Sequence, residues 1–206
     1  MRAHSCLLPL LFFLGSSSVV VLGAPTTRRA TNPNAQSAIE AIMPTSTTCA
    51  GAAFPDECRT AAQAAPFIIK AMTGFSLPEI AAMLANIGYE SDEMKFKHNV
   101  SPGRPGQGTS NMMLAKWVSP YAASIFGAGA IAGKSPDDIL AMVTPDEYNF
   151  GSAPWFLTQQ CGAAVRSALS AGTDAGWAAY MTCLDVDGSD PARLAYWTRA
   201  KSAFGL

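Results

Sequence analysis

Apolar residues recur at the spacing of one helix face over much of the chain, most clearly between residues 77 and 91. Ile80, Met83, Leu84 and Ile87 fall on one stripe of such a helix, because residues three and four positions apart share a face. Strict alternation of apolar and polar residues, which marks a half-buried strand, is nearly absent. The pattern therefore predicts an all-α fold.

Helix start signals support this fold class. A hydroxyl residue, a nearby proline and an acid three positions after the hydroxyl occur together at Ser76, Ser135 and Thr144, and Asp190 precedes a proline without the acid. This combination satisfies the free amides of a first helical turn. We expect helices at about residues 57–73, 77–91, 111–127, 135–142, 145–150, 153–171, 174–183 and 190–203.

One stretch, residues 95–110, has the composition of a loop. It contains three glycines and two prolines, which are Gly103, Gly106, Gly108, Pro102 and Pro105. Proline and glycine interrupt a helix at this density. A long loop within a compact helical domain is usually functional, so we expect residues of the functional site in this loop.

The chain begins with the pattern of a secretory signal. Residues 1–23 combine a basic start, apolar runs and small residues at the end, as a cleaved signal peptide does. A retained membrane anchor is the alternative, because residues 6–24 almost reach spanning length. We expect a flexible segment or propeptide over residues 24–35, with a dibasic processing site at residues 28–29, and one helical domain over residues 36–206.

Composition narrows the classes of function and partner. The chain is 49% hydrophobic and 14% charged, which excludes a disordered protein. Its 14 Lys and Arg balance 15 Asp and Glu, so no field concentrates nucleic acid or anionic lipid. We therefore expect a secreted, extracellular monomer with no nucleic-acid partner and, once the signal is removed, no membrane partner.

Four cysteines remain when Cys6 leaves with the signal, and an even number in a secreted chain predicts two disulfides. Three pairings are possible, and we favour Cys49 with Cys58 and Cys161 with Cys183, because local closure needs no particular topology. A zinc site is the alternative, but the close Cys-x2-Cys spacing is missing and few histidines are present. We expect neither a metal nor another cofactor.

Glu90 is the candidate general acid. Counted at 100° per residue from Ile80, it lies at about 280°, beside the apolar stripe and in the last turn of its helix. Partial burial and the negative end of the helix dipole both raise the pKa of a carboxyl group, as a general acid requires. The alternative is a solvated acid in a cluster with Asp92 and Glu93.

The segment from Ile80 to Met113 resembles the lysozyme-like glycosidase superfamily, in its lytic transglycosylase, goose-type lysozyme and chitinase-like branches. In those branches an acidic Glu that ends a helix is followed by a Gly-rich turn with Gln and Met, as at Glu90, Gln107 and Met112. The Trp- and Tyr-bearing, Ala-rich helices of the second half are similar as well. Residues 103–111 and 150–157 also resemble a group of secreted fungal proteins.

The resemblance implies a lysozyme-like helical fold with Glu90 as the proton donor. The polar loop residues, together with one aromatic residue, are then the substrate-binding candidates: Asn99, Gln107, Thr109, Asn111 and Trp155. A two-carboxylate glycosidase needs a second acid. Glu93 leans toward the same side of the helix, Asp146 and Glu147 are alternatives, and a single-acid mechanism stays open.

The expected function is that of a secreted glycoside hydrolase. Its polysaccharide substrate would be a β-linked cell-wall polymer such as peptidoglycan, chitin or chitosan, or a β-mannan. The alternative is a secreted carbohydrate-binding, effector or interaction protein that keeps the scaffold without turnover. The missing second acid favours this alternative, whereas the position of Glu90 and the polar loop favour the enzyme.

The acidic segment at residues 185–190 has the look of a calcium-binding loop. It lacks the glutamate that completes such a loop at the twelfth position. We therefore interpret it as a turn followed by the cap of the last helix.

The disulfide prediction can be checked by thiol titration. The mature protein, denatured without reductant, should show no free thiol, because an oxidising exterior would pair all four remaining cysteines. Two or more free thiols would contradict both the pairing and the compartment.

Overall fold

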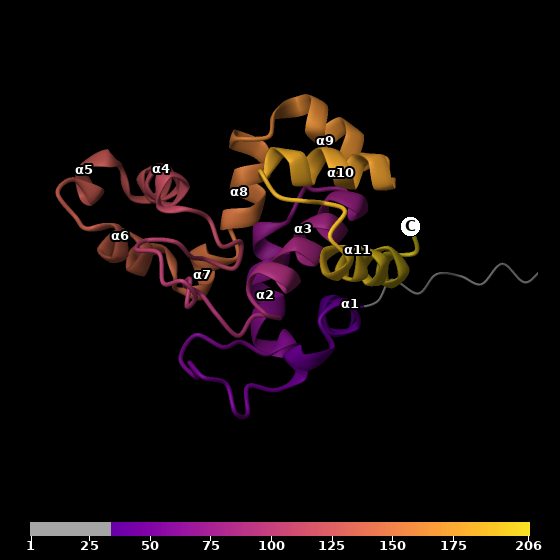
Figure 1. Cartoon of the computed structure of the whole chain (residues 1–206), viewed down its shortest axis with the longest axis horizontal. Coiled ribbons are helices and arrows are strands. Elements are labelled where there is room, and N and C mark those ends of the chain that lie inside the picture. Colours follow the sequence, from indigo (N-terminus) through magenta and orange to yellow (C-terminus); the bar gives the residue numbers. More distant parts are fainter. Residues whose placement is uncertain (1–33) are drawn as a thin grey trace, which may run out of the picture. The chain divides into compact units, whose positions relative to one another are not determined.

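Helices joined by turns make up the regular structure of residues 34–206, the part of the chain that the computed structural model describes (Figure 1). Two isolated β-bridges, His98 with Gly108 and Gly108 with Met113, supplement the helices. In chain order the helices are α1 (Ala35–Ile42), the 3₁₀ helix η1 (Pro44–Thr47), α2 (Ala61–Ala71), α3 (Leu77–Glu90), α4 (Ala115–Phe126), α5 (Ala128–Ile131), α6 (Pro136–Val143), α7 (Asp146–Asn149), α8 (Ser152–Gln159), α9 (Gly162–Ser170), α10 (Asp174–Cys183) and α11 (Pro191–Phe204).

The all-α prediction is confirmed, and most of the start signals act as caps. Ser135 Oγ accepts from the amide of Asp138, and Asp190 Oδ1 accepts from the amide of Arg193. At the start of α3, Glu79 Oε2 accepts from both the amide and the hydroxyl of Ser76. The cap predicted at Thr144 is wrong, because its hydroxyl donates to the Ala141 carbonyl at the end of α6.

The prediction of one long helix over residues 153–171 is wrong. The chain forms α8 and α9, which are separated at Gln160 and Cys161. Gly162 has φ of +73°, a conformation that a regular right-handed helix does not contain. Three short helices, α1, η1 and α5, were not expected. The predicted signal peptide and the dibasic site at residues 28–29 lie outside the described residues.

Helix α3 lies at the centre of the larger apolar core (Figure 1). Each residue from Ala81 to Gly88 is buried, which goes beyond the single buried stripe predicted from periodicity. Helices α1, α8, α9 and α11 pack against α3, and α11 makes the most extensive contact. Trp177 of α10 and Trp197 of α11 stack in the same core, with ring centroids 5.3 Å apart.

A second apolar cluster forms around α4, α6 and α8. Its buried members include Val118, Tyr121, Leu140, Val143 and Phe156. In Figure 1, α4 to α7 lie together on one side of α3. Cavity-lining residues come from both clusters, so the candidate site lies where the two meet.

Both predicted disulfides are confirmed. Cys49 bonds to Cys58 in the turn region before α2, and Cys161 bonds to Cys183. The second bond ties the start of α9 to the end of α10, next to the helix break. Within residues 34–206, no helix has the length and apolar character needed to cross a membrane.

The close packing of α9 on α10 gives a stability prediction at Gly176. A Cβ atom there would lie 2.3 Å from the carbonyl oxygen of Ala168 and 2.9 Å from Cα of Leu169. Because backbone atoms cannot give way as a side chain does, Gly176→Ala should reduce the free energy of unfolding by about 1 to 3 kcal/mol, measured by urea denaturation.

The matched control is Gly129→Ala, also within a helix. No atom lies within 4 Å of a Cβ at Gly129, so this change should be neutral or slightly stabilising. Equal stability of the two variants would contradict the described packing of α9 on α10.

Candidate functional site

A cavity of about 220 Å³ opens beside the C-terminal end of α3. Its polar lining includes Asn86, Glu90, Gln107, Asn111 and Arg193. Aromatic and aliphatic side chains form the remaining wall, among them Trp117, Phe156, Leu184 and Val186. The cavity is therefore amphipathic, because hydrogen-bonding groups and apolar groups both line it.

Glu90, the last residue of α3, is paired with Arg193 in the first turn of α11. Nη2 of Arg193 donates to Oε1 of Glu90 over 2.5 Å, and the two side chains are 10% and 20% exposed, respectively. Nη1 of Arg193 donates to Asn86, whose amide nitrogen donates to Asn111 over 2.7 Å. A chain of hydrogen bonds thus runs from the carboxyl group of Glu90 to the loop before α4.

Burial raises the pKa of the Glu90 carboxyl group, and the charge and hydrogen bond of Arg193 oppose this effect without cancelling it. The direction agrees with the prediction made from the helix pattern. The hydroxyl of Tyr180 is fully buried, and it has no hydrogen-bond partner among the described residues. Burial and the charge of Glu90 both raise the pKa of this tyrosine. The charge of Glu90 is therefore felt by a buried side chain as well as in the cavity.

The loop before α4 carries Gln107 into the cavity wall. Its amide nitrogen donates to the carbonyl of Met112 over 3.1 Å, whereas its buried Oε1 atom has no partner in the described structure. Thr109 and Met112 have φ values of +68° and +44°, which are uncommon for residues with side chains. Backbone strain of this kind often accompanies ligand sites, and here it lies next to the free acceptor of Gln107.

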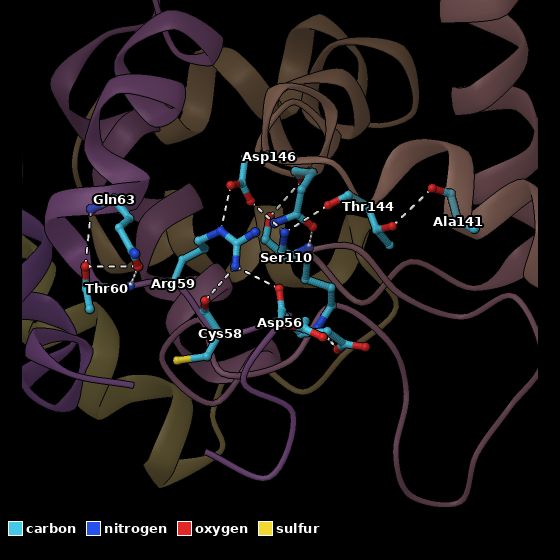
Figure 2. A network of polar contacts seen from close by, with 12 residues as sticks. Asp56, Cys58, Arg59, Thr60, Gln63, Ser110, Ala141, Thr144 and Asp146 are labelled. Carbon is cyan, nitrogen blue, oxygen red and sulfur yellow. Dashed lines mark hydrogen bonds and ion pairs between the residues drawn. The ribbon is translucent and has the colours of Figure 1, made fainter. Parts of the chain in front are cut away.

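A buried charge network holds the same loop in place. Lys97 Nζ and Arg59 Nε each lie 2.6 Å from a carboxylate oxygen of Asp146, and Lys97 also donates to the Thr144 carbonyl. Figure 2 shows Arg59 between Asp146 and the backbone carbonyls of Asp56 and Cys58, to which it also donates. The network therefore joins three segments. They are the disulfide-closed turn before α2, the loop before α4 that carries Lys97 and Gln107, and the start of α7.

Asp146 and Lys97 each favour the charged form of the other. Burial alone would raise the pKa of Asp146, but hydrogen bonds and charges from Arg59 and Lys97 hold it below its ordinary value. Burial lowers the pKa of Lys97, and the charge of Arg59 adds to this, while Asp146 and Glu57 oppose it. Only 6% of the Lys97 side chain is exposed, so this lysine depends on its carboxylate partner.

Glu93, the predicted second carboxylate, does not line the cavity. It is 7% exposed, and its Oε2 atom accepts from the amide and the hydroxyl of Thr45 over 2.5 and 2.6 Å. Oε1 accepts from the Tyr196 hydroxyl over 3.0 Å. Glu93 therefore connects η1 and α11 through hydrogen bonds. Asp146, an alternative for the base, belongs to the network with Lys97.

The substrate-binding candidates divide into two groups. Gln107 and Asn111 line the cavity with Glu90, whereas Asn99, Thr109 and Trp155 do not. Asn99 Oδ1 accepts from the amides of Gly103 and Arg104, which orders the turn between them. Thr109 is completely buried, and Trp155 packs against Tyr121 and Phe156 in the second apolar cluster.

The sequence interpretation missed several residues that line the cavity. Asn86 and Arg193 were not singled out, nor were Lys116 and Asp185. An arginine in an Ala-rich helix gives no signal of its partner 103 residues away. Asp185 lies in the segment that the sequence analysis interprets as a turn and a helix cap. This interpretation is confirmed, because Asp187 accepts a hydrogen bond from Ser189 and Asp190 caps α11.

A second cavity of about 350 Å³ lies among α1, α2, α3 and the end of α11. Its lining is almost entirely apolar, and Ile39, Ile68 and Phe75 are typical members. No acidic or basic side chain lines it. The smaller cavity at Glu90 is therefore the better candidate for chemistry. Within residues 34–206, no group of three or more His, Cys, Asp or Glu side chains lies close enough to hold a metal ion.

Comparison with known proteins gives one informative relative. A protein of Fusarium oxysporum named "Bifunctional dioxygenase (DOX)-epoxy alcohol synthase (EAS)" is 44% identical over 158 residues, which cover 70% of this chain and 12% of the relative. The chain therefore corresponds to a small part of that protein. No family model and no solved structure matches the chain.

This relative contradicts the expected function. It is named as an oxidative enzyme, so the prediction of a glycoside hydrolase, with its cell-wall polysaccharide substrates and its carbohydrate-binding alternative, is wrong. The features on which that prediction rested, a buried glutamate and a polar loop, are present in the structure. Their chemistry needs another explanation.

The network that holds the site loop can be tested at Asp146. Asp146→Asn leaves the buried ammonium of Lys97 without its carboxylate, which should reduce the free energy of unfolding by roughly 3 to 5 kcal/mol. Because the folded-state pKa of Asp146 is lowered, its contribution is present above the unfolded pKa and is lost as the pH falls. The difference between wild type and variant should therefore shrink as the pH falls below 3.8.

Asp92→Asn is the matched control, because Asp92 pairs with Lys95 on the surface, where its side chain is 60% exposed. Its effect should stay below about 1 kcal/mol. A difference between wild type and Asp146→Asn that does not change with pH would contradict an ionised Asp146 at this position.

Proposed function

We propose that residues 34–206 form a binding module for a small oxygenated ligand of the epoxy alcohol class, held in the cavity at Glu90. The observation that carries this proposal is that Glu90 and Gln107 line the same amphipathic cavity. Glu90 is a partly buried carboxyl group with a raised pKa, and the Oε1 atom of Gln107 is a buried acceptor without a partner among the described residues. A buried polar atom is stabilised when a ligand supplies its hydrogen bond.

An epoxy alcohol has the complementary groups. Its hydroxyl can donate to Gln107 Oε1, and its epoxide oxygen can accept from protonated Glu90 or from a cationic group such as Lys116. The name of the Fusarium relative supports this ligand class, since it contains an epoxy alcohol synthase. The module would then bind a compound of the kind that the relative is named as forming.

The apolar wall suits the hydrocarbon part of such a ligand. Trp117, Phe156 and Leu184 line the side of the cavity, where an alkyl group would bury apolar surface. A volume of about 220 Å³ lies below the range of about 300 to 1,000 Å³ for sites of drug-sized ligands. The cavity therefore fits a small molecule, or the oxygenated portion of a longer one.

The oxidative steps named for the relative do not fit the described residues. Chemistry with dioxygen depends on a metal or an organic cofactor, and a common protein site for iron combines two histidines with one carboxylate. Residues 34–206 contain one histidine, His98, whose Nδ1 atom lies 2.5 Å from Glu57, and their four cysteines form disulfides. We assign no oxidative step to this module.

We also propose that the scaffold belongs to the lysozyme-like superfamily and that the chain is secreted. A buried glutamate at the end of α3, facing a loop with Gln107, supports the first proposal. Two disulfides support the second, because they form in oxidising compartments. One fold hosts many functions, so a lysozyme-like scaffold is compatible with a ligand other than a polysaccharide.

Calorimetric titration with an alkyl-substituted glycidol tests the proposed ligand class. The compound should bind, and the corresponding allylic alcohol, which lacks the epoxide oxygen, should bind at least about tenfold more weakly because it forfeits a hydrogen bond to a charged or buried group. The alkane of equal length should show no binding at the same concentration.

Gln107→Ala should weaken binding of the glycidol by removing the acceptor for its hydroxyl. Gln36→Ala is the matched control, because Gln36 bonds to Glu40 on the exposed side of α1, outside the cavity. Equal affinity for the glycidol, the allylic alcohol and the alkane would refute the proposed ligand class.

A further inference from the structure

The cavity holds a second carboxyl group whose surroundings differ from those of Glu90. Asp185 follows the end of α10 and lines the same cavity. It is exposed, whereas Glu90 is largely buried, and its φ of +60° sets it apart from the helix before it. Two carboxyl groups in unlike surroundings are suited to act as a general acid and a general base.

One oxygen of Glu90 is available to a ligand. Arg193 engages Oε1, while Oε2 forms no hydrogen bond with any residue between 34 and 206. Because Glu90 lines the cavity, Oε2 is the atom that can present a proton to a bound molecule. Arg193 therefore acts as a positioning residue that orients the carboxyl group.

We infer that this cavity hydrolyses the epoxide of its ligand, with Glu90 as the general acid and Asp185 as the general base. The inference rests on the proposed function, because it assumes the same ligand class. Glu90 donates a proton to the epoxide oxygen as one carbon–oxygen bond of the ring breaks. Asp185 takes a proton from the water molecule whose oxygen forms the new bond to that carbon.

The reaction balances without an oxidant or a reductant. One epoxide and one water give a vicinal diol, so an epoxy alcohol becomes a triol. The proton that Asp185 has accepted passes to solvent, and Glu90 regains a proton from solvent. Gln107 holds the hydroxyl of the ligand through Oε1, which fixes the epoxide relative to the two acids.

The charged and titratable groups around Glu90 set the expected pH dependence. Burial favours its protonated form, and the guanidinium of Arg193 disfavours it. Arg104, Lys116 and Asp185 also line the cavity, and the charge of Glu90 raises the pKa of the buried Tyr180 hydroxyl. Because the acid must carry its proton, the rate should fall as the pH rises through the pKa of Glu90.

Triol formation from the alkyl-substituted glycidol in water labelled with heavy oxygen tests the inference with the full chain. Mass spectrometry should find one labelled oxygen in the product, at a rate above that of buffer alone. Glu90→Gln should reduce the rate at least about 100-fold, and so should Asp185→Asn. Asp187→Asn is the matched control, because Asp187 is an exposed acid that lies outside the cavity lining.

Binding of the glycidol itself is measured separately by calorimetry on the Asp185→Asn variant, which should turn it over too slowly to consume it. Retained binding by the Asp185→Asn variant, with lost turnover and an unchanged melting temperature, supports the inference even if Glu90→Gln unfolds. Binding without triol formation by wild type at any pH overturns the inference and leaves the proposed function standing. Absence of glycidol binding in calorimetry overturns both, and equal rates for wild type and both site variants also overturn the inference.

Discussion

The candidate site depends on one partly buried ion pair, between Glu90 at the end of α3 and Arg193 at the start of α11. A charge without a partner in the interior is costly, and pairing offsets that cost only when the geometry is good. Arg193 offsets part of this cost by donating to both Glu90 and Asn86, two residues of α3 that are one helical turn apart. The contact that secures the fold thus also orients the carboxyl group that faces the cavity.

A second charge cluster holds the loop that carries Gln107. Lys97 is buried and needs Asp146, and Asp146 in turn binds Arg59 from the turn before α2. Because these residues belong to three segments, the loop that carries Gln107 is connected to the turn before α2 and to the start of α7. The unusual backbone angles at Thr109 and Met112 persist because the surrounding contacts determine them. Site geometry in this protein therefore comes from long-range electrostatic contacts on a helical frame.

The sequence predicted the features that depend on residues close together in the chain. The start of α3, its buried face, the position of Glu90 and both disulfides follow from periodicity, capping and loop closure over short separations. The break before α9 depends on the φ of one glycine and was missed. The partnership of Glu90 with Arg193, and the capture of Glu93 by Thr45, join segments far apart in the chain. No spacing rule reports such contacts, so the sequence did not reveal Arg193 as the partner of Glu90 and wrongly placed Glu93 in the site.

Burial in the cavity, opposed but not cancelled by Arg193, raises the pKa of the Glu90 carboxyl group. Titration of its side-chain carboxyl carbon by NMR tests this most directly, with the resonance assigned by its loss in Glu90→Gln. We expect a midpoint above the ordinary value of 4.5. A midpoint at or below 4.5 would show that the ion pair outweighs burial, and it would contradict a role for Glu90 as a proton donor.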